Sequence, residues 1–79
     1  MQKIDFELRG DYIALDALLK ATGLAESGGT AKQMIVGGDV LLDGEVETRR
    51  SRKIRAGCVV QLGEAQIVVQ ADPNTASTL

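Results

Sequence analysis

The amino-acid sequence predicts an α+β fold in which two N-terminal helices pack on a small, mainly antiparallel sheet of four to five short strands. In two stretches of the first half, apolar residues recur every three or four positions, which is the spacing of one helical face. At the start and in the second half, apolar and polar residues alternate, which is the period of a strand. We expect a single domain over residues 1–71 and a disordered polar tail over residues 72–79, where the composition changes.

A short strand is expected ahead of the first helix, because three apolar residues alternate with charged ones: Ile4, Phe6 and Leu8. Asp11 is a candidate N-cap for the helix, which starts at Tyr12 or Ile13. The helix reaches Thr22, and Gly23 ends it. Its inner face consists of leucines: Leu15, Leu18 and Leu19.

The second helix has a clear start, because the hydroxyl of Ser27 can accept a hydrogen bond from the unpaired amides of a first turn. The helix is expected to begin at Gly28 and to reach Val36. Its buried face holds Ala31, Met34 and Ile35, and its other side presents Gly28, Gly29, Lys32 and Gln33 to a partner. Gly37 and Gly38 can adopt the left-handed conformation that closes a helix.

The dipeptide Asp43-Gly44 lies between two apolar runs and is a strong hairpin signal. Two registers are compatible with the sequence. A three-residue loop that includes Glu45 places Leu42 opposite Val46. A two-residue turn instead pairs Leu41 with Val46, and the sequence leaves this choice open.

Two more strands are expected at the end of the domain, over residues 58–62 and 65–71. Ile67 and Val69 share one face of the last strand. Cys58 alternates with Val60 and Leu62, so a buried apolar position is favoured over a reactive thiol.

A dense basic run follows the hairpin and holds five of the nine Lys and Arg residues: Arg49, Arg50, Arg52, Lys53 and Arg55. Such a run is usually a solvated loop. Here the chain must pass close to the helix that presents Lys32, and Ile54 is the one apolar residue that can anchor the loop to the core. We expect a local positive surface despite a net charge of −2, because exposed charges are screened over about 8 Å at physiological salt.

The order and spacing of these residues resemble the ribosomal-protein-S-four-type RNA-binding domain, also called the alpha-L motif, and within it the small stand-alone YbcJ-type proteins. The resemblance covers roughly residues 12–70. It rests on the leucines of the first helix with Gly23, on Ser27, Ala31 and Ile35, on residues 38–44, and on Lys53, Ile54 and Gly57.

The resemblance implies RNA binding through the second helix and the strands and loops that follow it, without catalysis. Many members carry Arg directly after the capping Ser, where this chain has Gly28. The backbone amides of Gly28 and Gly29 remain able to hold a phosphate at the helix start. The candidate RNA-binding residues are Gly28, Gly29, Lys32, Gln33, Arg49, Arg50, Arg52, Lys53 and Arg55.

The composition argues against catalysis, metal binding and a membrane location. The chain has no His and a single Cys, so a zinc site or a nucleophile–base pair lacks material, and we expect no cofactor. No apolar run approaches the ~20 residues of a membrane-spanning helix, and the first residues do not resemble a secretory signal. We expect a cytoplasmic protein.

The expected partner is structured RNA, such as rRNA or a tRNA-like molecule, in association with a ribosome or another ribonucleoprotein. Arg and Lys suit phosphate oxygens, whereas one Tyr, one Phe and no Trp offer few platforms for stacking unpaired bases. DNA is disfavoured, because the second helix offers only Lys32 and Gln33 as readers of base edges. The alternative hypothesis is an adaptor whose basic run docks on an acidic protein.

Overall fold

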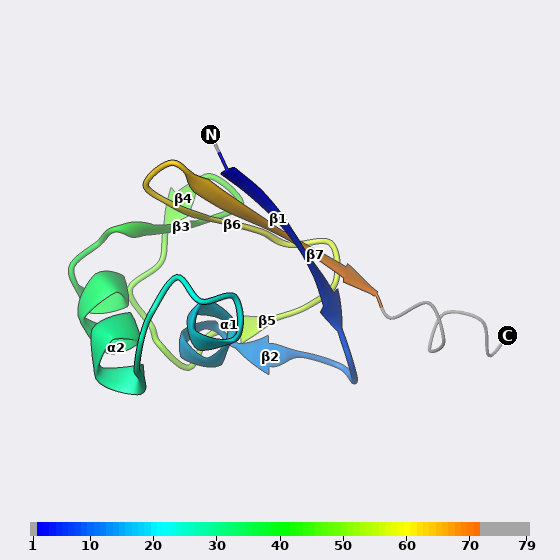
Figure 1. Ribbon diagram of the computed structural model, residues 1–79, viewed down its shortest axis with the longest axis horizontal. Helices are drawn as coiled ribbons and strands as arrows, with labels where there is room; N and C mark the ends of the chain where they lie inside the picture. Colours follow the sequence, from blue (N-terminus) through cyan, green and yellow to red (C-terminus); the bar gives the residue numbers. More distant parts are fainter. Residues whose placement is uncertain (1, 72–79) are drawn as a thin grey trace, which may run out of the picture.

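The computed structural model describes residues 2–71, so the tail predicted for residues 72–79 lies outside the described residues. Two helices and seven strands follow one another along the described chain (Figure 1). In order they are β1 (Gln2–Leu8), β2 (Ile13–Ala14), α1 (Leu15–Ala21), α2 (Gly28–Val36), β3 (Val40–Leu42), β4 (Glu45–Val46), β5 (Lys53–Ile54), β6 (Val59–Leu62) and β7 (Ala65–Ala71).

Five strands form one sheet in the order β1-β7-β6-β3-β4, and β2 and β5 form a separate two-stranded sheet. The pairing is antiparallel throughout, except that β1 runs parallel to β7. These findings confirm the α+β class and the mainly antiparallel sheet. The description of the helices as N-terminal is wrong, because β1 and β2 precede them and β1 is an integral strand of the sheet.

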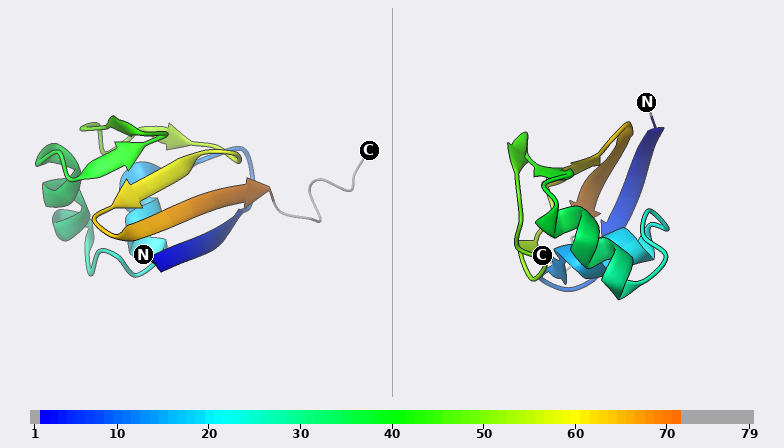
Figure 2. Two further views of the ribbon diagram at one scale, coloured as in Figure 1. Left: turned by 90° about the horizontal axis from the view of Figure 1, so that it is seen from above. Right: turned by 90° about the vertical axis from the view of Figure 1, so that its left-hand side faces the viewer.

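Both helices lie on the same side of the five-stranded sheet, as two views at right angles show (Figures 1 and 2). The core between them is made of apolar side chains from every layer: Leu8, Leu15, Leu18, Leu19, Ala25, Ala31, Ile35, Val40, Ile54, Val60, Ile67 and Val69. Ile4 and Phe6 pack against this core from β1, as their alternation predicted. Cys58 is only half-buried beside it.

Helix α1 begins at Leu15, later than the sequence predicted. The residues before it, Ile13 and Ala14, pair with β5 as the short strand β2. The N-cap is Ala14, in extended conformation and without a side-chain hydrogen bond, so the prediction that Asp11 caps this helix is wrong. The strand pairing takes precedence because it buries Ile54 opposite Ile13.

Helix α2 spans Gly28–Val36, as predicted. The hydroxyl oxygen of Ser27 accepts a hydrogen bond from the amide of Thr30 at 3.2 Å, which satisfies one of the unpaired donors of the first turn. Of the two glycines that follow the helix, only Gly38 has the left-handed conformation, with φ of 83°. Gly37 has φ of −72° and continues the right-handed turn as the C-cap.

The hairpin between β3 and β4 has the two-residue turn. Leu41 pairs with Val46 and Leu42 with Glu45, so the three-residue alternative is wrong. Asp43 and Gly44 both have positive φ, at 50° and 89°. Positive values at both central positions are what a type I′ turn requires, and its twist matches that of the flanking strands.

Replacement of Ile54 by Ala should lower the free energy of unfolding by about 2–5 kcal/mol, because Ile54 is fully buried in the hydrophobic core. The expected control is Val36→Ala, which alters a side chain that is 60% exposed and should change stability by no more than about 0.5 kcal/mol. Urea unfolding followed by circular dichroism measures both changes. If Ile54→Ala lowers the free energy of unfolding no more than Val36→Ala does, Ile54 does not anchor the basic run to the core.

Candidate nucleic-acid interface

The segment over residues 47–52, called the arginine loop below, joins β4 to β5 and is held by helix α1. The amide of Leu15 donates a hydrogen bond to the carbonyl oxygen of Arg52 at 2.9 Å, and the amide of Asp16 donates to that of Arg50 at 3.1 Å. The first amides of a helix have no acceptor inside the helix. The loop therefore caps α1, and α1 fixes the backbone from which the arginines project.

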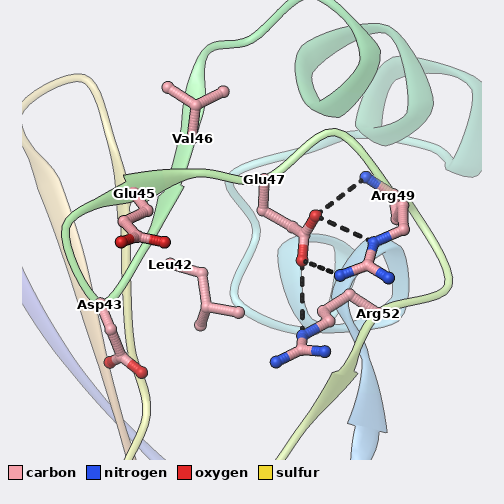
Figure 3. Close-up of a pocket in the computed structure, with 7 residues that line it drawn as sticks. All are labelled: Leu42, Asp43, Glu45, Val46, Glu47, Arg49 and Arg52. Carbon is pink, nitrogen blue, oxygen red and sulfur yellow. Dashed lines mark hydrogen bonds and ion pairs between the residues drawn. The ribbon is translucent and has the colours of Figure 1, made fainter.

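The carboxylate of Glu47 lies at the centre of the arginine loop (Figure 3). Its Oε2 atom accepts hydrogen bonds from Nε of Arg49 at 3.3 Å and from the backbone amides of Thr48 and Arg49. Its Oε1 atom lies 3.3 Å from Nη2 of Arg49 and 3.4 Å from Nε of Arg52. The Glu47 side chain is 12% exposed, so little of this anion faces solvent.

The contacts with Arg49 lower the pKa of Glu47 below its ordinary value of 4.5, chiefly through the side-chain hydrogen bonds. The positive charges of Arg49 and Arg52 act in the same direction, while partial burial opposes them. Glu47 is therefore a stable carboxylate at neutral pH. Our sequence analysis missed it, although an acidic residue two positions before Arg49 was a visible signal.

The five cations of the basic run all have exposed side chains. Arg49 is 69% exposed and Arg52 is 45% exposed, even though both contact Glu47. The Nζ atom of Lys53 lies 5.0 Å from the centre of the Tyr12 ring, which is itself half exposed. Such a cation–π contact holds the ammonium group near the ring. Arg50 and Arg55 complete the exposed set.

Ile54 is the buried residue within this run, which confirms the predicted anchor. It pairs with Ile13 of β2, directly before α1. The basic run is therefore attached at two points, through the Ile54 side chain and through the carbonyl groups that cap α1.

The candidate residues of α2 are exposed, but the surface hollows that they line are not the hollows lined by Arg49 and Arg52. Gly29, Lys32 and Gln33 line a shallow depression together with Val36 and Gly37. Gly28 lines a second one, beside Asp16, Ala17 and Lys20 of α1. Arg49 and Arg52 line two further hollows: one with the hairpin residues of Figure 3, and one with Ser51 and Lys53. The contact of any of these residues with RNA stays a prediction.

Within residues 2–71, no three or more His, Cys, Asp and Glu side chains gather where a metal ion would be held. Neither α1 nor α2 has the length and apolar character of a membrane-crossing helix.

A family model of the S4 domain matches residues 6–70. The chain belongs to the S4 domain family. The Escherichia coli (strain K12) protein named "Putative RNA-binding protein YbcJ" is 43% identical to this S4 domain over 60 residues, which cover 76% of this chain and 86% of that protein. The Shigella flexneri protein named "Uncharacterized protein YbcJ" matches with the same values.

The S4 domain also resembles a solved structure. The solution structure of YbcJ from E. coli, described as revealing an alpha-L motif involved in RNA binding, superimposes with a TM-score of 0.56. The two sequences are 38% identical, and the match covers 86% of this chain and 87% of that one. The predicted family and the alpha-L motif are therefore confirmed, and the E. coli relative is named as an RNA-binding protein rather than as an enzyme.

The pH dependence of stability should report the Glu47 cluster. The pKa of Glu47 is lower in the folded state than in the unfolded chain, so its contribution is complete above pH 4.5 and is lost as the pH falls through the folded-state pKa. The difference in unfolding free energy between wild type and Glu47→Gln should therefore be largest near neutral pH, at about 1 kcal/mol, and should shrink in acid. Urea unfolding at several pH values measures it, with Glu45→Gln as the control. A difference that does not vary with pH would contradict the assignment.

Proposed function

We propose that this S4 domain binds structured RNA and has no catalytic activity of its own. The observation that carries the proposal is the arginine loop, which presents three exposed arginines from a backbone that α1 holds in place. The name of the E. coli relative and the description of its structure support an RNA partner. The proposed contacts are the candidate set: Gly28, Gly29, Lys32, Gln33, Arg49, Arg50, Arg52, Lys53 and Arg55.

The chemistry of these residues favours the phosphate backbone over the bases. A guanidinium group is a planar array of five N–H donors that matches the oxygens of a phosphate, and it keeps its charge at every physiological pH. Lys32 and Lys53 add point charges. At the start of α2, the first-turn amides of Gly28 and Gly29 suit an anion without help from a side chain.

The shortage of exposed aromatic residues favours a folded or double-helical RNA over an unpaired strand. Phe6 packs against the core, and Tyr12 is the one large aromatic side chain exposed within the described residues. Stacking of successive bases needs several such platforms. An RNA helix is instead recognised by its shape and by contacts to phosphates and 2′-hydroxyl groups. We propose rRNA or a tRNA-like molecule in the cytoplasm, with ribosome association as one setting.

Substitution of Arg49, Arg50 and Arg52 by Ala should weaken binding to a structured RNA at least about tenfold, because charge-assisted hydrogen bonds contribute ~1.5–3 kcal/mol each. If the wild-type domain neutralises about four or five phosphates, the logarithm of its affinity should fall with the logarithm of salt at a slope near −3 to −4. The triple variant should reduce that slope by roughly 2 to 3 units. Filter binding at several salt concentrations measures both quantities.

The matched control carries Gln2→Glu and Lys3→Glu on exposed residues of β1, which lowers the net charge by the same three units at the other edge of the sheet from β4. Circular dichroism establishes that both variants fold. Equal RNA binding by the wild type and the arginine variant would refute the proposal. A different result would favour the adaptor function instead. In that case the wild type retains an acidic protein partner after nuclease treatment, the arginine variant loses this partner, and the two proteins bind RNA equally well.

The α2 part of the surface has its own test, because Lys32 lines a separate hollow. Lys32→Ala should weaken RNA binding about two- to fivefold and lower the salt slope by ~0.7–0.9, as expected for one phosphate contact. Lys3→Ala, on the exposed face of β1, is the control for the change in net charge. If the two variants bind RNA equally well, the interface does not include this face of α2.

A further inference from the structure

We infer that Glu47 is a positioning residue that orients Arg49 and Arg52 into a two-armed site for the phosphates of an RNA backbone. This inference rests on the proposed function, because it concerns how the arginine loop would engage its ligand. A carboxylate within a phosphate-binding loop otherwise looks unfavourable, since it repels the ligand. Its contacts show what it does to the arginines.

Glu47 binds one side of each guanidinium group. A guanidinium group has a side edge, made by Nε and Nη2, and a terminal edge, made by Nη1 and Nη2. The two oxygens of Glu47 take the side edge of Arg49 at 3.3 Å each. Arg52 likewise turns its Nε atom toward Glu47. In both arginines the nitrogens that Glu47 does not hold point away from it (Figure 3).

The terminal edges are therefore available for a second anion. Each retains the paired N–H donors that bind a phosphate through two parallel hydrogen bonds. The 69% exposure of Arg49 and the 45% exposure of Arg52 leave these groups accessible to a large ligand. One carboxylate thus holds two arginines without consuming the donors that suit a phosphate.

Glu47 also brings the two arginines together. Nη2 of Arg49 and Nε of Arg52 both lie within 3.4 Å of the same oxygen, Oε1. Two like charges so close repel each other, and the carboxylate between them offsets that repulsion. Without Glu47, both side chains would gain rotational freedom and separate, and binding would have to order them again at an entropic cost.

The carboxylate can act in this way because the protein holds it in place. The Glu47 amide donates a hydrogen bond to the carbonyl oxygen of Val40 in β3 at 3.0 Å. The amides of Thr48 and Arg49 donate to its Oε2 atom. The orientation of the arginines is therefore set from the sheet through Glu47.

A charge-matched comparison separates positioning from simple repulsion. Glu47→Gln and Glu45→Gln each remove one negative charge from the same hairpin, but Glu45 is an exposed residue of β4. If Glu47 only repels RNA, both variants bind RNA tighter than the wild type. If Glu47 positions the arginines, Glu47→Gln binds about fivefold more weakly than Glu45→Gln.

The affinities are measured by fluorescence anisotropy with a labelled synthetic RNA stem-loop, at one fixed salt concentration. In the free protein, the Nε–H signal of Arg49 in an NMR spectrum should be protected from exchange in the wild type and in Glu45→Gln, because this group donates a hydrogen bond to Glu47. Glu47→Gln should lose that protection. Equal or tighter RNA binding by Glu47→Gln, relative to Glu45→Gln, would overturn the inference.

A second pair of variants decides the matter if Glu47→Gln does not fold. Arg49→Lys keeps the charge but removes the edge that Glu47 holds, whereas the Arg50 side chain has no hydrogen bond or ion pair with Glu47 in the described chain. Arg49→Lys should therefore weaken binding of the stem-loop more than Arg50→Lys. Equal effects would refute positioning by Glu47. The proposed function fails separately, if the Arg49, Arg50 and Arg52 triple variant still binds RNA.

Discussion

The structure depends on a reciprocal contact between helix α1 and the arginine loop. Helix α1 has no side-chain cap, and its first amides are satisfied by the carbonyl groups of Arg52 and Arg50. The first amides of a short helix need acceptors from outside the helix, and the loop carbonyl groups supply them. The same hydrogen bonds hold the backbone of the arginine loop in place. Because Ile13 and Ala14 pair with β5 immediately beside them, the fold and the candidate site share one set of interactions.

The basic residues of this chain are unevenly distributed along its sequence. The net charge is −2, yet the basic run is concentrated in one segment between β4 and the turn before β6. The exposed carboxylates of β1 belong to the opposite edge of the five-stranded sheet from β4, where the arginine loop begins. Glu47 is the acidic side chain that forms ion pairs with Arg49 and Arg52, and its negative charge partly offsets theirs.

The sequence predicted the local elements well, because local signals determine them. Ser27 and Gly38 delimit α2, and the Asp43-Gly44 turn defines the hairpin. The features that the sequence did not predict depend on contacts between residues far apart in the chain. The late start of α1 depends on pairing with β5, about 40 residues away along the chain. The sequence shows an acidic residue two positions before Arg49, but it does not show that the fold brings Arg52 to the same carboxylate.

The parallel pairing of β1 with β7 joins the two ends of the described chain, since Gln2 lies opposite Ala65 and Leu8 opposite Ala71. Contacts between residues so distant in sequence close a loop over most of the described chain, and closing a loop of this length has a substantial entropic cost. β1 therefore covers an edge of β7 whose backbone groups would otherwise be unpaired and open to association with another strand. The alternating charges of Lys3, Asp5 and Glu7 on the docked strand then disfavour further strand addition at this edge.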